Sequence, residues 1–109
     1  MKTLHMPAVI ESYFHASNAN DINALVACFS PNATVADENQ THRGTAAIRA
    51  WAIDVRKKYE FTIEVLSAAE AAEATAVTTK VSGNFPGSPV NLDFRFGLAG
   101  DKIKSLEIG

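Results

Sequence analysis

The first half of the chain has the hydrophobic spacing of helices. Apolar residues recur every three or four positions in three segments, which start near Pro7, Asp21 and Gly44. Proline suits a first helical turn and aspartate can cap one, so these residues mark where the first two helices begin. The three predicted apolar faces contain Val9, Ile10, Tyr13, Phe14 and Ser17; Ile22, Leu25, Val26 and Phe29; and Ile48, Trp51, Ala52, Val55 and Tyr59. The cations of the third segment are predicted to lie on its solvated side: Arg49, Arg56, Lys57 and Lys58.

From Phe61 onward the hydrophobic period changes to two, which is the period of strands. Alternating rows run through residues 61–65, 74–81 and 90–98, and a shorter apolar run at 103–108 follows them. Residues 67–74 are rich in alanine and glutamate, which favours helix, but the segment is short, so we interpret it as strand ends around a turn. Pro86-Gly87 and Gly100-Asp101 predict two further turns. In the final run, Ile103, Leu106 and Ile108 do not all fall on one face of a regular strand. Their spacing predicts a bulge near Lys104.

The segment Phe29–Gly44 joins the two patterns. Ser30, Pro31 and Asn32 interrupt the second helix, and Ala33, Val35 and Asp37 then share one face of a short strand. The first two of these are apolar, so we expect that face, Asp37 included, to point inward. An inward carboxylate is costly unless it has partners or a function. The alternative is that Asp37 ends the strand at the protein surface. Residues 39–43 are predicted to form a polar loop.

Three helices followed by four long strands, with one short strand between helices, is an α+β pattern. We expect a cone-like fold in which the N-terminal helices pack on a strongly curved, mainly antiparallel sheet that encloses a pocket. A chain of 109 residues is long enough for a single domain, spanning residues 1–109, with a buried core.

Composition narrows the class of protein. The chain is 47% hydrophobic and 20% charged, as soluble globular proteins are. Its net charge of −2 gives no electrostatic footprint for nucleic acid, and no apolar run approaches the roughly 20 residues that span a membrane. Cys28 is the single cysteine and adjoins an apolar face, so a buried, inert thiol is expected. Because Met1–Met6 lacks the apolar segment of a signal peptide, a cytoplasmic protein is expected.

The sequence contains no pattern that calls for a cofactor. No spacing of His, Cys, Asp and Glu suggests a metal site. No glycine-rich loop suggests a bound nucleotide. We therefore expect a protein that works without a cofactor or a metal.

Two stretches of the chain resemble a known superfamily. They are AVIESYFHASNANDINALVACFSPNATVADE at residues 8–38 and HRGTAAIRAWA at residues 42–52. Their amino-acid sequence and the order of the elements resemble the nuclear transport factor 2-like superfamily. Within it, the SnoaL-like polyketide cyclases and the ketosteroid isomerases are the most similar. The resemblance covers nearly the whole chain. It implies the cone-shaped fold, which carries isomerases, cyclases, hydrolases, dehydratases and non-catalytic scaffolds.

The resemblance also implies roles for individual residues. Tyr13 matches the tyrosine that donates a hydrogen bond to the developing oxyanion in the isomerases, and Asp37 matches their general base. The isomerases add a protonated aspartic acid on a later strand. The FRF motif at residues 94–96 places Leu92 at that position, and Asp93 falls on the opposite face. The implied oxyanion site is therefore half built. Arg95 lies two residues after Asp93 and so is expected on the same outward face of the strand. The Asp–Arg–Asp arrangement of the family's epoxide hydrolases is therefore not expected.

Other side chains are candidates for the same pocket. His42 follows Asp37 by five positions and is a candidate acid or base at the pocket mouth, or a solvent-facing loop histidine. Tyr13 is either the oxyanion donor or a core tyrosine bonded to backbone. The expected pocket lining, unless these residues are plain core, comprises Trp51, Val55, Phe61, Phe85, Leu92 and Phe94.

These residues favour an isomerase-like or polyketide cyclase-like enzyme that acts on a small apolar, carbonyl-containing ligand. Asp37 would take a proton from carbon while Tyr13 polarises the oxygen. A non-catalytic ligand-binding or association module of the same fold is the alternative, as is a hydrolase or dehydratase. Related proteins commonly pair through the outer sheet face, so a homodimer is expected. The residues expected on that face are Thr78, Lys80, Asn91, Asp93 and Arg95.

Overall fold

Three helices and six strands form the described part of the chain. The structure is a computed structural model that describes residues 6–71 and 74–109. In chain order the elements are α1 (Ala8–Asn18), α2 (Ile22–Ala27), β1 (Phe29–Asp37), β2 (Gln40–Arg43), α3 (Thr45–Lys58), β3 (Phe61–Glu70), β4 (Thr75–Gly83), β5 (Val90–Ala99) and β6 (Lys102–Ile108). The three predicted helices are therefore present.

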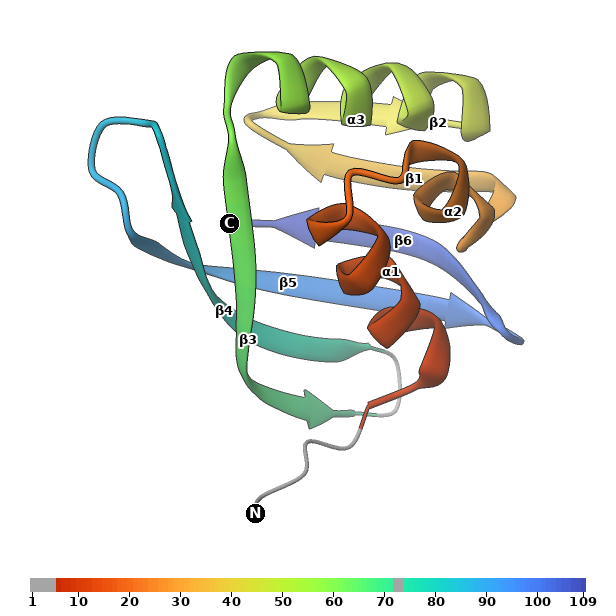
Figure 1. Ribbon diagram of the computed structural model, residues 1–109. Coiled ribbons are helices and arrows are strands. Elements are labelled where there is room, and N and C mark those ends of the chain that lie inside the picture. The colour runs from red at the N-terminus through yellow and green to blue at the C-terminus, as the bar shows by residue number, and fades with distance from the viewer. Residues whose placement is uncertain (1–5, 72–73) are drawn as a thin grey trace.

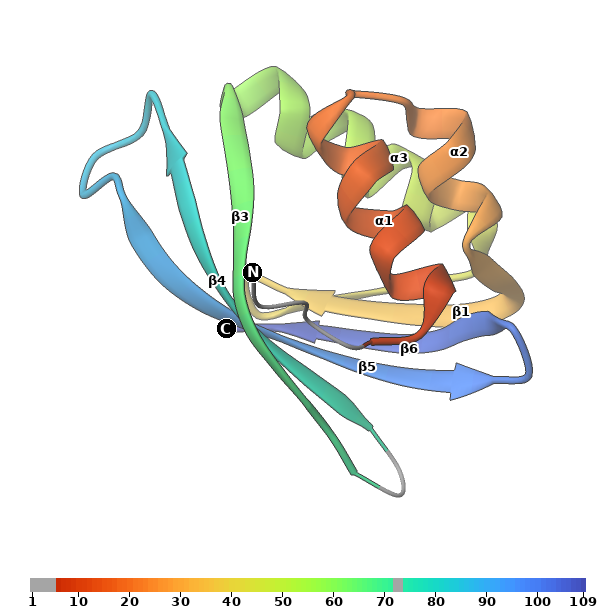
Figure 2. The same cartoon turned by 60° about the horizontal axis from the view of Figure 1, so that its bottom comes forward.

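The strands make one curled, mixed sheet. Its order is β2-β1-β6-β5-β4-β3, and every neighbouring pair is antiparallel except β1 with β6. All three helices lie on one side of this sheet (Figure 1). A second view shows how strongly the sheet bends around them (Figure 2). This arrangement confirms the predicted α+β fold with a curved, mainly antiparallel sheet.

Local chemistry explains where the helices begin. The helix α1 follows Pro7 directly. At the start of α2, the carboxylate of Asp21 accepts a hydrogen bond from the backbone N–H of Ala24 at 3.1 Å, as predicted for a capping residue. Cys28 follows α2 and is buried, with its Sγ donating to the carbonyl of Ala24. The predicted inert thiol is thus a packed side chain.

An aromatic cluster fills the space between α1 and the sheet. The Tyr13 ring lies edge-on to the rings of Phe14, Phe29 and Phe96, with centroid separations of 5.2, 6.0 and 5.4 Å. Phe94 packs against Phe14 at 5.2 Å. Edge-to-face pairs of this kind stabilise aromatic cores and fix ring orientation. The cluster therefore holds the side chains of α1 in a defined position over the sheet.

The second helix ends earlier than predicted. It stops at Ala27, and Phe29, which was assigned to its apolar face, is the first residue of β1. Phe29 pairs with Ile103 of β6 and is buried in the same core that a helical Phe29 would have entered. Pro31 lies in the irregular stretch between the Phe29 and Thr34 pairings, where a missing N–H is tolerated.

Residues 39–43 are not the predicted loop. Glu38 and Asn39 have φ of 53° and 63°, as a two-residue hairpin turn requires, and Gln40–Arg43 returns as the edge strand β2. Its register pairs Asp37 with Gln40 and Val35 with His42. The strand was missed because its side chains are all polar, so no alternation marks it.

The remaining strands follow the predicted alternation. Val77, Thr79 and Val81 are buried, and the pairing of Gly97 with Ser105 and of Leu98 with Ile103 leaves a bulge at Lys104, as predicted. The turn predicted within residues 67–74 falls between β3 and β4, and its residues 72–73 lie outside the described residues, as does the N-terminal stretch 1–5. Within residues 6–71 and 74–109 the longest helix has 14 residues, and none is long and apolar enough to cross a membrane.

Candidate active site

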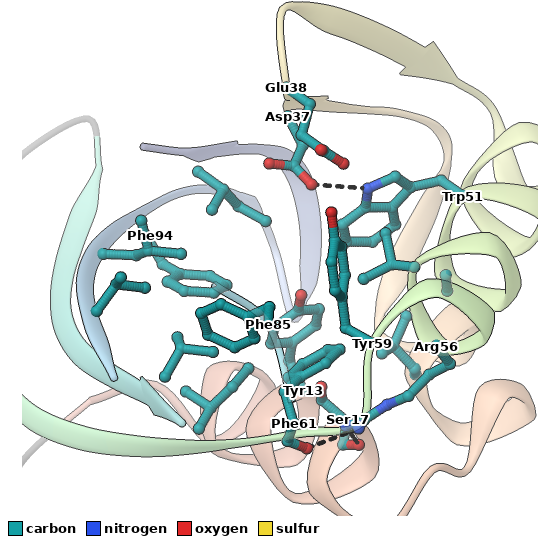
Figure 3. A pocket seen from close by; sticks show the side chains of 18 of the residues that line it. Tyr13, Ser17, Asp37, Glu38, Trp51, Arg56, Tyr59, Phe61, Phe85 and Phe94 are labelled. Carbon is teal, nitrogen blue, oxygen red and sulfur yellow. Dashed lines mark hydrogen bonds between the residues drawn. The ribbon is translucent and has the colours of Figure 1, made fainter. Parts of the chain in front are cut away.

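A cavity of about 730 Å³ lies between the helices and the curved sheet (Figure 3). Aromatic and aliphatic side chains form most of its wall. The residues expected to line a pocket all do so, namely Trp51, Val55, Phe61, Phe85, Leu92 and Phe94. Tyr13 and Asp37 open on the same cavity. Its volume is in the range of sites that take small organic ligands.

Asp37 is a half-buried carboxylate at the end of β1, where the Glu38-Asn39 turn begins. The indole Nε1 of Trp51, on α3, donates a hydrogen bond to its Oδ2 at 3.1 Å. Burial raises the pKa of Asp37 above its ordinary value, while the Trp51 hydrogen bond acts in the opposite direction. The carboxylate is thus a cavity-lining group with a defined orientation.

Tyr13 is 2% exposed, and its ring is fixed by the aromatic cluster beneath α1. None of the side-chain hydrogen bonds found among residues 6–71 and 74–109 involves the Tyr13 hydroxyl, and Tyr13 lines the cavity. Burial, and secondarily the charge of Asp37, raise the pKa of Tyr13. The phenol therefore stays protonated and able to donate to a ligand in the cavity.

His42 is the predicted site residue that does not line the cavity. It lies in β2, and its ring stands 6.2 Å from the Trp51 ring at an interplanar angle of 35°. Its charge lowers the pKa of Asp37 only as a minor effect. The hairpin that makes β2 a strand places this histidine beside Trp51 instead of at the pocket mouth.

Leu92, which the resemblance matches to the second acid of the isomerases, lines the cavity. Asp93 pairs with Thr78 and is exposed on the other face of the sheet, as its parity predicted. The carbonyl of Leu92 accepts a hydrogen bond from the Thr79 hydroxyl at 2.9 Å, which fixes the strand at this point. The cavity wall is therefore apolar at this position.

Arg56 is a cavity residue that the sequence analysis placed wrongly on the solvated side of α3. Its Nη1 donates to the carbonyl of Phe61 at 2.6 Å, and its Nη2 donates to the carbonyl of Ser17. Its Cζ lies 3.8 Å from the centroid of the Phe61 ring. The signal was available, because Arg56 follows the buried Ala52 by four positions and so shares its face.

Tyr59 also lines the cavity, just beyond the end of α3. Its ring lies edge-on to Phe85 with centroids 5.8 Å apart. Figure 3 shows its side chain extending along the cavity wall toward the Asp37–Trp51 pair. Among the described residues, no group of three or more His, Cys, Asp and Glu side chains is placed to hold a metal ion.

Helices packed on a curled sheet around one cavity define the ketosteroid isomerase-like, nuclear transport factor 2-like class of folds. Within that class the chain belongs to the SnoaL-like domain family, whose family model matches residues 10–105. The resemblance stated from the sequence is thereby confirmed.

Solved structures agree with this assignment. A candidate polyketide cyclase from Sinorhizobium meliloti is 38% identical, with a TM-score of 0.93 and 95% of each chain covered. A protein of ketosteroid isomerase-like fold from Catenulispora acidiphila, in complex with trimethylamine, is 19% identical, with a TM-score of 0.86 and coverages of 96% and 86%. The epoxide hydrolase/cyclase-like enzyme SalBIII, described for pyran ring formation in salinomycin, is 24% identical, with a TM-score of 0.80 and coverages of 92% and 85%. The last two similarities concern the fold alone.

Proposed function

We propose that this protein is an isomerase- or cyclase-like enzyme that moves a proton on a small, mainly apolar carbonyl compound. Asp37 is the general base, and the Tyr13 hydroxyl donates a hydrogen bond to the oxygen of the substrate. The observation that carries the proposal is the opening of one carboxylate and one unpaired phenol on a single apolar cavity.

The chemistry follows from the two groups. Asp37 takes a proton from the carbon next to the carbonyl, and the electron pair of that C–H bond forms an enolate. Tyr13 donates to the oxygen as negative charge develops on it. Return of the proton to another carbon completes an isomerisation. Attack of the enolate carbon on a second carbonyl, followed by protonation of the new alkoxide, completes an aldol-type ring closure.

Two features of the cavity suit this reaction. The raised pKa of Asp37 makes its carboxylate a stronger base than an exposed aspartate. The hydrogen bond from Trp51 holds Oδ2 in place, so the base does not have to be oriented when the substrate binds. The similarity to a candidate polyketide cyclase at 38% identity supports a substrate with ketone groups.

Leu92 favours a second candidate, a ligand-binding module without catalysis. With an apolar side chain at that position, Tyr13 has no acidic partner for stabilising an oxyanion. The cavity would then hold an apolar ligand, and Asp37 would serve as the acceptor of the Trp51 hydrogen bond.

Exchange of carbon-bound protons with solvent separates the two candidates. Cyclohexanone, 2-tetralone and 2-cyclohexenone would be incubated with the protein in D2O and followed by proton NMR. We expect the wild type to accelerate deuterium incorporation into at least one ketone. Asp37→Asn should lower the catalysed rate of deuterium incorporation by about 10²–10⁴-fold, and Tyr13→Phe should lower it by about 10²–10³-fold.

The matched control is Asp101→Asn, because Asp101 is an exposed carboxylate in the turn between β5 and β6 and does not line the cavity. It should exchange protons at the wild-type rate. Ketone binding without exchange in the wild type would instead support the ligand-binding module.

We also propose that the protein is a homodimer that pairs through the outer face of the sheet. The expected row exists, because Thr78 pairs with Asp93 and Lys80 with Asn91, next to Arg95. Mixed polar and charged side chains suit a moderately polar interface between identical subunits.

A further inference from the structure

Arg56 places a positive charge in a cavity that is otherwise mainly apolar. Figure 3 shows its guanidinium beside Ser17 and Phe61, at the opposite end of the cavity from Asp37 and Trp51. The side chain is only partly exposed. The cavity therefore has two polar ends of opposite charge, separated by aromatic and aliphatic walls.

The donors of Arg56 are incompletely used. A guanidinium carries five N–H groups. One from each Nη reaches a backbone carbonyl, that of Phe61 or that of Ser17. Within residues 6–71 and 74–109, the remaining three donors have no protein partner, and the ion pairs present, Lys58 with Asp54 and Arg95 with Glu107, do not involve Arg56.

The backbone contacts orient this cation without neutralising it. Carbonyl groups supply partial charges, and the Phe61 ring covers one face of the guanidinium at 3.8 Å. A partly buried cation without a carboxylate partner is unfavourable, and burial accordingly lowers the pKa of Arg56. A carboxylate is a suitable partner for such a cation, because the fork of guanidinium N–H groups matches a carboxylate in two places.

We propose that the cavity takes a ligand with a carboxylate, which pairs with Arg56. This inference deepens the proposed function, because the substrate class becomes oxo-carboxylic acids. The negative charge of Asp37 repels the ligand carboxylate toward the Arg56 end. A ketone further along the same ligand then lies toward Asp37, in the same cavity that Tyr13 lines (Figure 3). The binding claim rests on Arg56 alone, and only the placement of the reacting carbon rests on the proposed function.

A pair of matched probes tests the claim without any turnover. The acid is 4-oxo-4-phenylbutanoate, and its neutral counterpart is the primary amide of the same skeleton. Dissociation constants for both would be measured by calorimetry at low ionic strength with wild type, Arg56→Met, Arg56→Lys and Lys57→Met. Lys57 is the matched control, because it is an exposed cation adjacent to Arg56 on α3.

The wild type should bind the acid at least about tenfold more tightly than the amide, since hydrogen bonds to charged groups are stronger than neutral ones. Arg56→Met should abolish that preference while leaving the amide affinity within about twofold, and Lys57→Met should retain it. Arg56→Lys keeps the charge but not the fork, so its preference should fall below that of the wild type.

Two results would overturn the proposal. The first is a wild type that does not prefer the acid, whether it binds both probes equally or neither. The second is an Arg56→Met variant in which both affinities fall together, because Arg56 would then only fasten α1 and β3 to α3. Should Arg56→Met fail to fold by circular dichroism, Arg56→Lys decides, and an unchanged acid-to-amide ratio in that variant counts against the proposal.

These outcomes are separable from those of the proposed function. Asp37→Asn should keep the preference for the acid while losing proton exchange. If the wild type exchanges protons on neutral ketones but does not prefer the acid, the carboxylate proposal is rejected and the proposed enzymatic function stands. If the wild type prefers the acid but exchanges no protons, the enzymatic function is rejected and the carboxylate proposal stands.

Discussion

Two opposing effects set the protonation state of Asp37. Desolvation favours the neutral carboxyl, whereas the Trp51 N–H favours the carboxylate. Desolvation is the larger effect, so the folded-state pKa lies above the unfolded one. The folded protein therefore binds more protons at this site, and its stability falls as the pH rises between the two pKa values. Above the folded-state pKa the whole cost of the buried charge is present.

Asp37→Asn should consequently stabilise the protein, and more so at higher pH. An amide oxygen can still accept the Trp51 hydrogen bond, but it carries no charge to desolvate. We expect the difference in melting temperature between Asp37→Asn and wild type to grow from pH 4 to pH 7. Asp101→Asn, at an exposed position in the β5–β6 turn, should show no such trend. A difference that shrinks with pH would contradict the sign of this pKa shift.

At the level of residues, the alternation of side chains along a strand was a good guide to orientation, whereas a run of like charges was a poor one. The apolar Ala33 and Val35 favoured an inward Asp37, with a surface position as the alternative, because the period of a strand is strict, and Asp37 lines the cavity. Arg56 was misplaced because it adjoins Lys57 and Lys58, which are indeed exposed. Its long aliphatic stem lets the charged end reach the cavity from the edge of the helix, which a pattern of charges does not show.

Among the elements, α1 is joined directly to the edge strand β3 by the side chain of Asn18. The Asn18 amide donates to the carbonyl of Ile63 and accepts from its N–H, both at 2.8 Å. The side chain thus replaces a neighbouring strand at one position of an edge that has no further strand in the described residues. Because Tyr13 lies on the same helix, this contact also helps to fix the phenol over the cavity.

Asn18→Ala should lower the free energy of unfolding by about 1–3 kcal/mol, because two hydrogen bonds are lost together. Urea denaturation monitored by Trp51 fluorescence measures the change. Asn32→Ala is the control, since Asn32 is exposed and lies outside the proposed dimer face. Equal midpoints for the two variants would show that the Asn18 contact contributes no stability.

The elements that the sequence predicted best are those with an apolar face. The alternation in β4 and β5 and the bulge at Lys104 follow from hydrophobic parity alone. The strand β2 does not, because Gln40–Arg43 is polar throughout and pairs with β1 through the geometry of the preceding turn. Phe29 is ambiguous in a different way, since helix and strand would both bury it.

On the scale of the whole molecule, the convex face of the sheet is left without a covering helix in the described residues (Figure 2). It presents Lys80, Asp93 and Arg95 as exposed side chains. Opposite charges in one patch can pair with their symmetry mates when two copies meet face to face. This is the basis of the predicted homodimer.

Light scattering at micromolar concentration should give a mass about twice the 11.7 kDa of one chain. Reversing charge on the outer face with Lys80→Glu and Arg95→Glu should shift the mass toward the monomer. Lys57→Glu, which changes an exposed cation on α3, should leave the dimer intact. A monomeric mass for the wild type would contradict the predicted homodimer.

The overall fold could be predicted from the sequence, apart from strand β2 and the end of α2, whereas the site could be predicted only in part. The fold is encoded by many apolar positions that agree with one another. The site depends on a few polar side chains whose contacts are set by tertiary packing, as the Trp51–Asp37 hydrogen bond and the Arg56–Phe61 contact illustrate. The family match does not replace those contacts, because this fold supports many reactions.

The pH dependence of carbon-bound proton exchange tests the central claim most directly. If Asp37 is the base, the wild-type rate at low ketone concentration should rise with pH through one ionisation, because only the carboxylate can take the proton. Its midpoint should lie above the ordinary aspartate value of about 3.9, in the direction of the raised pKa. Asp37→Asn should stay at the uncatalysed background at every pH. A variant that keeps the wild-type profile would contradict the claim that this cavity works through Asp37.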